Sequence, residues 1–341
     1  MRLRICILVC VALMLSAAVF AAAASPTYHQ TKKIVIGGEG GWDYLTFDGM
    51  SRHLYVSRST RVQVIDVDKG VLVGEIPNTE GVHGIALAGR THRGFTSNGR
   101  SNSVTVFDTE TLKEVGRVNV GKNPDAIIFD RASNRIFTFN GGSSDATAID
   151  VDTLKVAGTI PLGGRPEFGA SDGAGKVFVN IEDKSEIVAI DSKALTVKNR
   201  WSLAPGDSPT GLAVDARNHR LFSVCGNEKM IVMDSETGKI IATPTIGKRP
   251  DAAAFDGRAS LAFSSNGEGT VTVISEESPD KFTVVQTLQT QMGARTMALD
   301  RRTGEIFLAA AQYAPAPAGT NNPRQRPAIL PNSFVILVFG K

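Results

Sequence analysis

The segment Arg135-Ile-Phe-Thr-Phe-Asn140-Gly141 contains one unit of a pattern that recurs along this chain of 341 residues. Its Ile136–Phe139 part is a short run of β-branched and aromatic residues, which is typical of a strand. Asn140-Gly141 is a pair that tolerates the positive φ of a tight hairpin, and a third β-rich stretch follows and ends at Asp150. The segment therefore predicts two antiparallel strands joined by a hairpin.

A strand before this hairpin ends at Asp130, and equivalent strand ends recur at intervals of 40 to 44 residues. Ala88 replaces the aspartate in one copy. Such a regular period is typical of repeat architectures. The seven strand ends are Asp48, Ala88, Asp130, Asp172, Asp215, Asp256 and Asp300.

The first six copies continue with a second, a third and a fourth strand, and Glu114 to Val120 is an example of the fourth. Four antiparallel strands in about 40 to 45 residues form the period of a β-propeller blade. The last copy lacks a fourth strand, and Lys32 to Ile36 has the pattern to supply it. We therefore predict an all-β, seven-bladed β-propeller of four-stranded antiparallel blades, closed by an N-terminal strand that pairs into the last blade and leaves no open edge.

Repetition separates the scaffold from candidate functional residues. A catalytic group is needed only once in a protein. An aspartate that ends most of the first strands therefore has a structural role that recurs in most blades. We expect these aspartates, and those ending the third strands such as Asp108, to accept hydrogen bonds from backbone N–H groups in the following turns. Function is therefore sought where the repeat is broken.

The units Val104-Thr-Val-Phe-Asp108 and Ile187-Val-Ala-Ile-Asp191, with Lys122-Asn-Pro-Asp-Ala126, resemble the YVTN repeat of YncE-like propellers. The resemblance covers nearly the whole chain after its N-terminal segment. It implies the propeller fold and is weak for function, because the superfamily includes exported binding proteins, cell-surface proteins and relatives fused to redox domains. Lactonase-type propellers share the architecture and keep an enzymatic alternative open.

The first 24 residues are typical of a secretion signal, because Arg2 and Arg4 precede an apolar run that ends in small residues at Ala22 and Ala24. The run is about 16 residues long, short of the about 20 that span a bilayer, so we expect no stable membrane insertion. We expect 1–24 to be removed and 25–341 to form the propeller as a periplasmic or secreted monomer. Cleavage leaves the single thiol Cys225, hence no internal disulfide.

Seven residues, each five positions before a strand end, are expected to form a ring around the mouth of the central channel. Four are acids and one is histidine, a set that accepts hard or borderline cations. We therefore expect no cofactor except a possible divalent cation, while a purely structural role as turn residues stays open. The ring consists of Asp43, His83, Asp125, Glu167, Thr210, Asp251 and Arg295.

A second set of residues is expected at the rim of the same face. It combines basic and aromatic side chains with two arginines of a Pro-rich insertion at 312–332 in the last blade. Long loops of this kind are usually functional or disordered, and the insertion is a candidate partner-binding segment or lid. The rim set consists of Trp42, Arg165, Arg249, Tyr313, Arg324 and Arg326.

Three function classes remain open from the sequence. The first is an exported, noncatalytic binding or scaffold propeller that presents the ring and the Pro-rich loop to a protein or small-molecule ligand. The second is a lactonase-like, metal-dependent hydrolase, although no Gly-x-Ser-x-Gly elbow, P-loop, His-x-His or Cys-x-x-Cys pair is present. The third is a single-stranded DNA or polyanion binder, for which the net charge of +3 gives little support.

Overall fold

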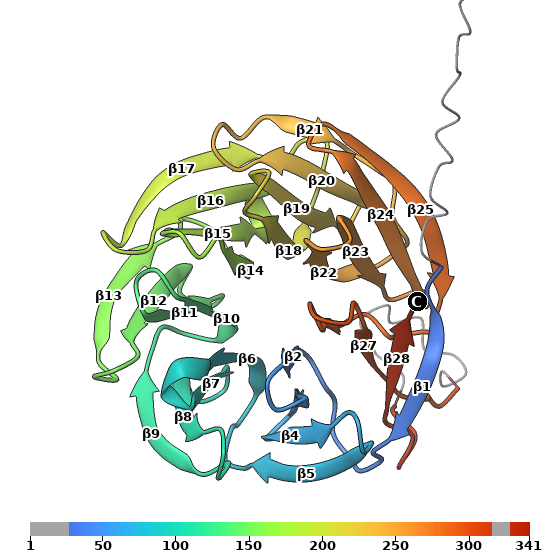
Figure 1. Ribbon diagram of the computed structural model, residues 1–341. Coiled ribbons are helices and arrows are strands. Elements are labelled where there is room, and N and C mark those ends of the chain that lie inside the picture. Colours follow the sequence, from blue (N-terminus) through green and yellow to red (C-terminus); the bar gives the residue numbers. More distant parts are fainter. Residues whose placement is uncertain (1–26, 316–327) are drawn as a thin grey trace, which may run out of the picture.

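A computed structural model describes residues 27–315 and 328–341, and these residues form seven four-stranded antiparallel sheets. The sheets stand around a central axis as the blades of a propeller (Figure 1). The strands next to the axis are β2 (Leu45–Asp48), β6 (Val82–Ala88), β10 (Pro124–Asp130), β14 (Pro166–Ser171), β18 (Pro209–Asp215), β22 (Pro250–Asp256) and β26 (Met297–Leu299).

Two further strands follow in each blade as a hairpin. The second strands are β3 (His53–Arg58), β7 (Arg93–Asn98), β11 (Arg135–Asn140), β15 (Lys176–Ile181), β19 (Arg220–Cys225), β23 (Leu261–Asn266) and β27 (Ile306–Ala310). The third strands are β4 (Arg61–Asp66), β8 (Ser103–Asp108), β12 (Asp145–Asp150), β16 (Glu186–Asp191), β20 (Lys229–Asp234), β24 (Thr270–Ser278) and β28 (Val335–Gly340).

The outer strands complete the blades. They are β5 (Val71–Ile76), β9 (Glu114–Asn119), β13 (Val156–Pro161), β17 (Thr196–Ser202), β21 (Ile240–Ala242), β25 (Lys281–Gln289) and β1 (His29–Val35). Two short 3-10 helices, η1 (Gly89–Thr91) and η2 (Glu182–Lys184), lie in connections. In residues 27–315 and 328–341 no helix has both the length and the hydrophobicity of a transmembrane span.

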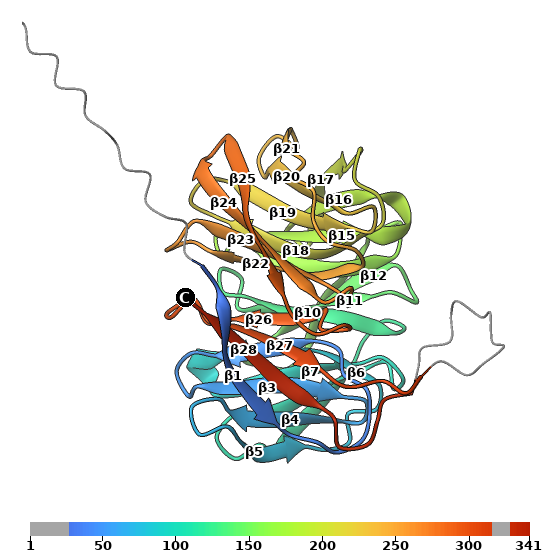
Figure 2. The same cartoon turned by 90° about the vertical axis from the view of Figure 1, so that its right-hand side faces the viewer.

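The closure expected from the sequence is confirmed. Strand β1 pairs antiparallel with β28, with His29 opposite Gly340 and Val35 opposite Val335, so the N-terminal strand is the outer strand of the last blade. Figure 2 shows β1 running alongside β28 at the edge of the disc. This pairing removes the free edge that a three-stranded last blade would expose.

The core consists of clusters of buried apolar side chains, each shared by two neighbouring blades. Seven such clusters in the described residues match the seven blade interfaces. The middle strands pack against a neighbouring blade on both faces, which is why runs such as Ile136–Phe139 are buried throughout rather than at alternate positions. Hydrophobic burial between blades therefore holds the disc together.

The strand-ending aspartates act as the sequence predicts. Asp48 accepts a hydrogen bond from the backbone N–H of Met50, and Asp108 accepts bonds from the N–H groups of Glu110 and Thr111. Asp130 adds a contact to the next blade, because Ser171 Oγ donates to it at 2.6 Å. These side chains satisfy backbone donors that the tight turns leave free.

The predicted role of the Asn-Gly pairs is wrong. Neither residue of the pair at 140–141 has a positive φ, and the left-handed position of that hairpin is Ser144, at φ 56°. Asn140 is instead fully buried, and its amide donates to Asp145 and Thr147 on the facing strand. The pattern marks a buried amide that cross-links the hairpin, which explains why it recurs.

The Pro-rich insertion is described only at its base. Ala314 N donates to Ala328 O and Leu330 N donates to Gln312 O, both at 2.8 Å, so the two stems of the insertion pair with each other. Residues 316–327, which include Arg324 and Arg326, lie outside the described residues, as does the predicted signal segment 1–24.

Candidate functional site

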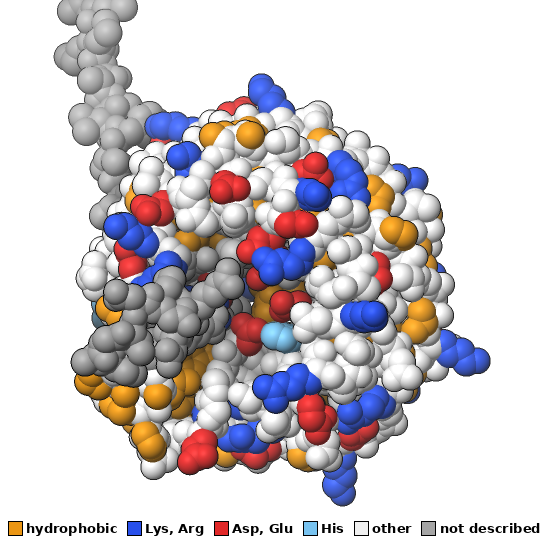
Figure 3. Space-filling view, turned by 180° about the vertical axis from the view of Figure 1, so that it is seen from behind, with side chains coloured by type: hydrophobic (Ala, Val, Ile, Leu, Met, Phe, Trp, Pro, Cys, Tyr) orange, Lys and Arg blue, Asp and Glu red, His pale blue; other side chains and the backbone are white. Residues whose placement is uncertain are grey.

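The predicted ring lies at one mouth of the central channel, on the face seen in Figure 3. Acidic side chains gather there around a hollow, with a histidine and Lys or Arg side chains beside them. The hollow is a chamber of about 330 Å³. Six of the seven predicted ring residues line it, namely Asp43, Asp125, Glu167, Thr210, Asp251 and Arg295.

His83, the seventh ring residue, contacts two acids of this wall. Its Nδ1 lies 2.7 Å from Oδ2 of Asp43 and 3.7 Å from Oδ1 of Asp125. Burial lowers the pKa of His83, but the bond to Asp43 and the charge of Asp125 outweigh it and raise the pKa above the usual value. One ligand atom from each of the three residues lies within 4.8 Å of the others, so the group could hold a metal ion.

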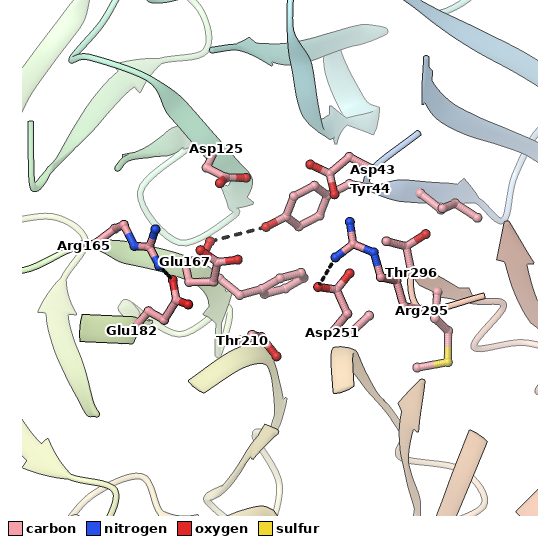
Figure 4. A pocket seen from close by; sticks show the side chains of 14 residues that line it. Asp43, Tyr44, Asp125, Arg165, Glu167, Glu182, Thr210, Asp251, Arg295 and Thr296 are labelled. Atoms are coloured by element: carbon pink, nitrogen blue, oxygen red, sulfur yellow. Dashed lines mark hydrogen bonds and ion pairs between the residues drawn. The ribbon is translucent and has the colours of Figure 1, made fainter. Parts of the chain in front are cut away.

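Two arginines of the chamber are already paired with acids, as Figure 4 shows. Arg295 Nη1 lies 2.8 Å from Oδ1 of Asp251, and Arg165 pairs with Glu182. Arg249, predicted at the rim, donates to the carbonyl oxygen of Gly267 at 2.8 Å. These three arginines therefore act as local partners of the loops.

Two carboxyl groups of the chamber hold their protons unusually tightly. Burial raises the pKa of Asp125 to about 6, with His83 opposing and Asp43 adding to the rise. Burial, together with the negative charges of Asp125, Glu182 and Asp251, raises the pKa of Glu167 to about 9. These shifts have a common cause, which is the crowding of carboxyl groups in a partly closed space.

The floor of the chamber is an aromatic pair that the sequence analysis missed. Tyr44 and Phe168 come from blades on different sides of the axis, yet their ring centroids lie 5.3 Å apart. Tyr44 Oη also donates to the carbonyl oxygen of Glu167 at 3.4 Å (Figure 4). Burial and the surrounding acids raise the pKa of Tyr44 well above its usual value. Phe168 also lines a wider cavity of about 670 Å³, together with residues that include Phe47, Phe129 and Phe255.

One sequence signal for this floor existed. Tyr44 and Phe168 occupy the position four residues before the strand end, where the other copies have Gly84, Ala126, Gly211, Ala252 and Thr296. Two large rings at a position of small residues break the repeat. Thr296, at the same position, is 4% exposed, lines the chamber and has a hydroxyl without a hydrogen-bond partner among the described residues.

A groove of about 480 Å³ adjoins the chamber on the side of the last blades. It shares Glu167, Glu182 and Asp251 with the chamber and adds the apolar surfaces of Met292 and Tyr313. Trp42 packs against this side of the groove. Its ring centroid lies 6.5 Å from that of Tyr313 and 5.2 Å from that of Phe334. Trp42 is therefore a packing residue beneath the rim.

Side chains from neighbouring blades fix the backbone of the ring. Asn180 Nδ2 donates to the carbonyl oxygen of Thr210 at 2.7 Å, Ser97 Oγ donates to that of Asp125, and Ser265 Oγ donates to that of Arg295. Each donor belongs to the blade that precedes the ring residue. The ring is thus built on rigid strands and cross-linked between blades, which favours a defined binding geometry.

No family model matches this chain, and none of the curated proteins matches it in sequence. Among solved structures, it is similar to the hydrazine synthase of Kuenenia stuttgartiensis, with a TM-score of 0.70 and 14% sequence identity. The match covers 80% of this chain and 94% of that one. At this identity the similarity concerns the fold alone.

Proposed function

We propose that this protein is an exported, noncatalytic binding propeller that captures a small, positively charged ligand at its channel mouth. The charge balance of the chamber carries the proposal, because carboxyl groups outnumber arginines there. The lining acids are Asp43, Asp125, Glu167, Glu182 and Asp251, and the lining arginines are Arg165 and Arg295.

The two arginines do not neutralise the whole wall. They are engaged with Glu182 and Asp251, and Glu167 forms no ion pair among the described residues. Asp43 and Asp125 share His83 as their cationic neighbour. A positive ligand would therefore meet an acidic wall in a recessed site, where charges attract more strongly than in open water. Its charge would also favour release of the proton that burial holds on Glu167.

The adjoining groove supports a ligand that also has an apolar part. Met292 is 64% exposed and Tyr313 lies beside it, while Glu167 and Asp251 belong to both cavities. A small organic cation can place its charged group in the chamber and its apolar part in the groove. Export is proposed from the sequence alone, because Arg2 and Arg4 precede an apolar run that ends in small residues.

Calorimetric titration of the purified protein tests this proposal with putrescine and agmatine, and with 1,4-butanediol as the uncharged match. We expect the amines to bind with release of the proton that Glu167 holds in the free protein, and Glu167→Gln, which cannot ionise, to weaken their binding by about tenfold, a loss within the range of one charged contact. Glu110→Gln makes the same change at an exposed turn away from the mouth and should have no effect. Equal binding of butanediol, or equal losses in both variants, would contradict the proposal.

A lactonase-like hydrolase is the second candidate, and the convergence of Asp43, His83 and Asp125 is the observation that favours it. A lactone screen with added divalent metals tests it, and turnover that His83→Gln abolishes would support it. Binding of single-stranded DNA or another polyanion has less support, because Arg165 and Arg295 of the mouth are paired with acids.

A further inference from the structure

We propose that Asp43, His83 and Asp125 together hold one divalent transition-metal ion. This inference rests on the proposed function, since both use the same chamber, but it names a different ligand and a different part of the wall. Nδ1 of His83 faces both carboxylates, at 2.7 Å from Asp43 and 3.7 Å from Asp125. One ligand atom of each residue lies within 4.8 Å of the others.

The donor set fits a borderline cation. Imidazole nitrogen and carboxylate oxygen bind Zn²⁺, Mn²⁺ and Co²⁺, with bonds of about 2.0 to 2.2 Å for zinc. Two donors around one ion then lie about 3 to 4 Å apart, which is close to the separations of His83 from the two acids. Three protein ligands leave further positions of the ion open toward the chamber.

The three ligands come from three consecutive blades whose backbones are fixed at this point. Ser57 Oγ accepts a hydrogen bond from the backbone N–H of Asp43 at 3.0 Å. Ser97 Oγ accepts one from the N–H of Gly84, next to His83, and donates to the carbonyl oxygen of Asp125. One serine thus ties the backbone beside two of the three ligands, which is the support that a preorganised metal site needs.

The far edge of the imidazole is also packed in place. A Cβ atom added at Gly99 would lie 2.8 Å from Nε2 of His83 and 2.8 Å from Oδ1 of Asn123. Gly99 is buried, and its φ is not positive, so space rather than backbone conformation requires glycine there. This close approach holds the ring with its Nδ1 edge toward the acids.

An independent observation points to a bound species in the same chamber. Thr296 is 4% exposed, lines the chamber, and its hydroxyl has no hydrogen-bond partner among the described residues. Buried hydroxyls are nearly always satisfied by protein, water or ligand. The hydroxyl of Thr296 is therefore a group whose hydrogen bonding a bound water or ligand of this chamber would complete.

The metal and the organic cation use different parts of the wall. Asp43 and Asp125 line the chamber but not the groove, whereas Glu167, Glu182 and Asp251 line both. The ion would therefore lie on the side of the first three blades and leave the groove side accessible. This division allows the two kinds of binding to be tested separately.

The test is titration of EDTA-treated full-length protein with Zn²⁺, Mn²⁺ and Ca²⁺, together with the visible absorption spectrum of Co²⁺. We expect one transition-metal ion per chain, and weaker binding by at least about tenfold in His83→Gln and Asp125→Asn, the loss typical of altered metal sites. Asp251→Asn is the matched control, because it removes a carboxylate of the same chamber that pairs with Arg295. Its metal affinity should stay within about threefold, since it offers no ligand to the ion.

Absence of metal binding by the wild type, or equal losses in Asp251→Asn and His83→Gln, would overturn the inference. If the variants do not fold, Mn²⁺ broadening of imidazole signals in the wild type decides, with His83 affected and His92 and His219 unaffected. Amine binding without metal binding removes this inference and leaves the proposed function intact. Loss of both kinds of binding removes the proposed function as well.

Discussion

Asp130 illustrates how one recurrent side chain contributes to stability. It is fully buried and accepts bonds from the N–H and Oγ of Ser133 and from Ser171 of the next blade. We expect Asp130→Ala to lower the free energy of unfolding by about 2 kcal/mol, because several buried donors lose their acceptor. Among the described residues, Asp150 accepts bonds only within its own turn, so it should lose less on the same change. Urea unfolding measures both, and equal losses would contradict the contribution of the contact between blades.

Glu276 makes stability depend on pH on the face away from the ring. Burial raises its pKa to about 7, the hydrogen bond from Asn218 opposes the rise, and the charge of Asp215 adds to it, while Arg220 opposes it. The folded state therefore keeps a proton that the unfolded chain releases at about pH 4.3. The stabilisation is complete below that pH and is lost as the pH rises through about 7.

We expect Glu276→Gln to reduce this decline, because an amide does not titrate. Urea midpoints at about pH 5, 6, 7 and 8 provide the measurement, across the window set by the two pKa values. Glu277→Gln is the control, since Lys281 lowers the pKa of the neighbouring, exposed Glu277. A decline of the same size in wild type and Glu276→Gln would show that another group causes it.

The hairpin that contains Gly99 positions a ring side chain. We expect Gly99→Ala to displace His83, because the new methyl group would lie 2.8 Å from its Nε2. Metal affinity should fall by about tenfold although all three ligands remain. At Gly89 an added Cβ meets nothing within 4 Å, so Gly89→Ala should leave affinity unchanged. Unchanged metal binding in Gly99→Ala would mean that the hairpin does not position the imidazole.

Strand β1 provides a neighbouring pair of residues that separates core packing from strand pairing. Ile34 is 2% exposed and packs in the cluster between the last and first blades, whereas Val35 is 68% exposed. Ile34→Asp should cost about 3 kcal/mol or more, because it buries a charge in place of an apolar side chain. Val35→Asp should change stability by less than about 0.5 kcal/mol. Thermal unfolding tests the difference. A loss for Ile34→Asp as small as that for Val35→Asp would mean that β1 contributes little to closure.

The propeller could be predicted from the sequence because its signals are local and repeated. Strand ends at regular intervals determine the number of blades, and the missing last strand indicates the closure, which the β1–β28 pairing confirms. The ring was predictable for the same reason, since equivalent positions of neighbouring blades lie side by side. His83 therefore contacts Asp43 and Asp125, one blade away on either side.

Contacts across the axis could not be predicted in this way. Tyr44 and Phe168 are three blades apart, and only the channel radius and the side-chain directions decide whether they meet. The role of Asn140 was missed for a related reason, because the pair with Gly141 has the composition of a tight turn and its burial depends on the neighbouring blade. The repeat predicts which residues of neighbouring blades lie at equivalent positions. The contacts inside the channel depend instead on the sizes and directions of side chains that differ from blade to blade.

The seam between β1 and β28 has a mechanical consequence. His29 pairs with Gly340, so the two ends of the described chain leave the seam at the same point. Tension applied between them loads the backbone hydrogen bonds one after another, as in unzipping, rather than all at once, as in shear. The fold should therefore yield first at this blade under a low pulling force, while the other blades remain folded until the seam has opened.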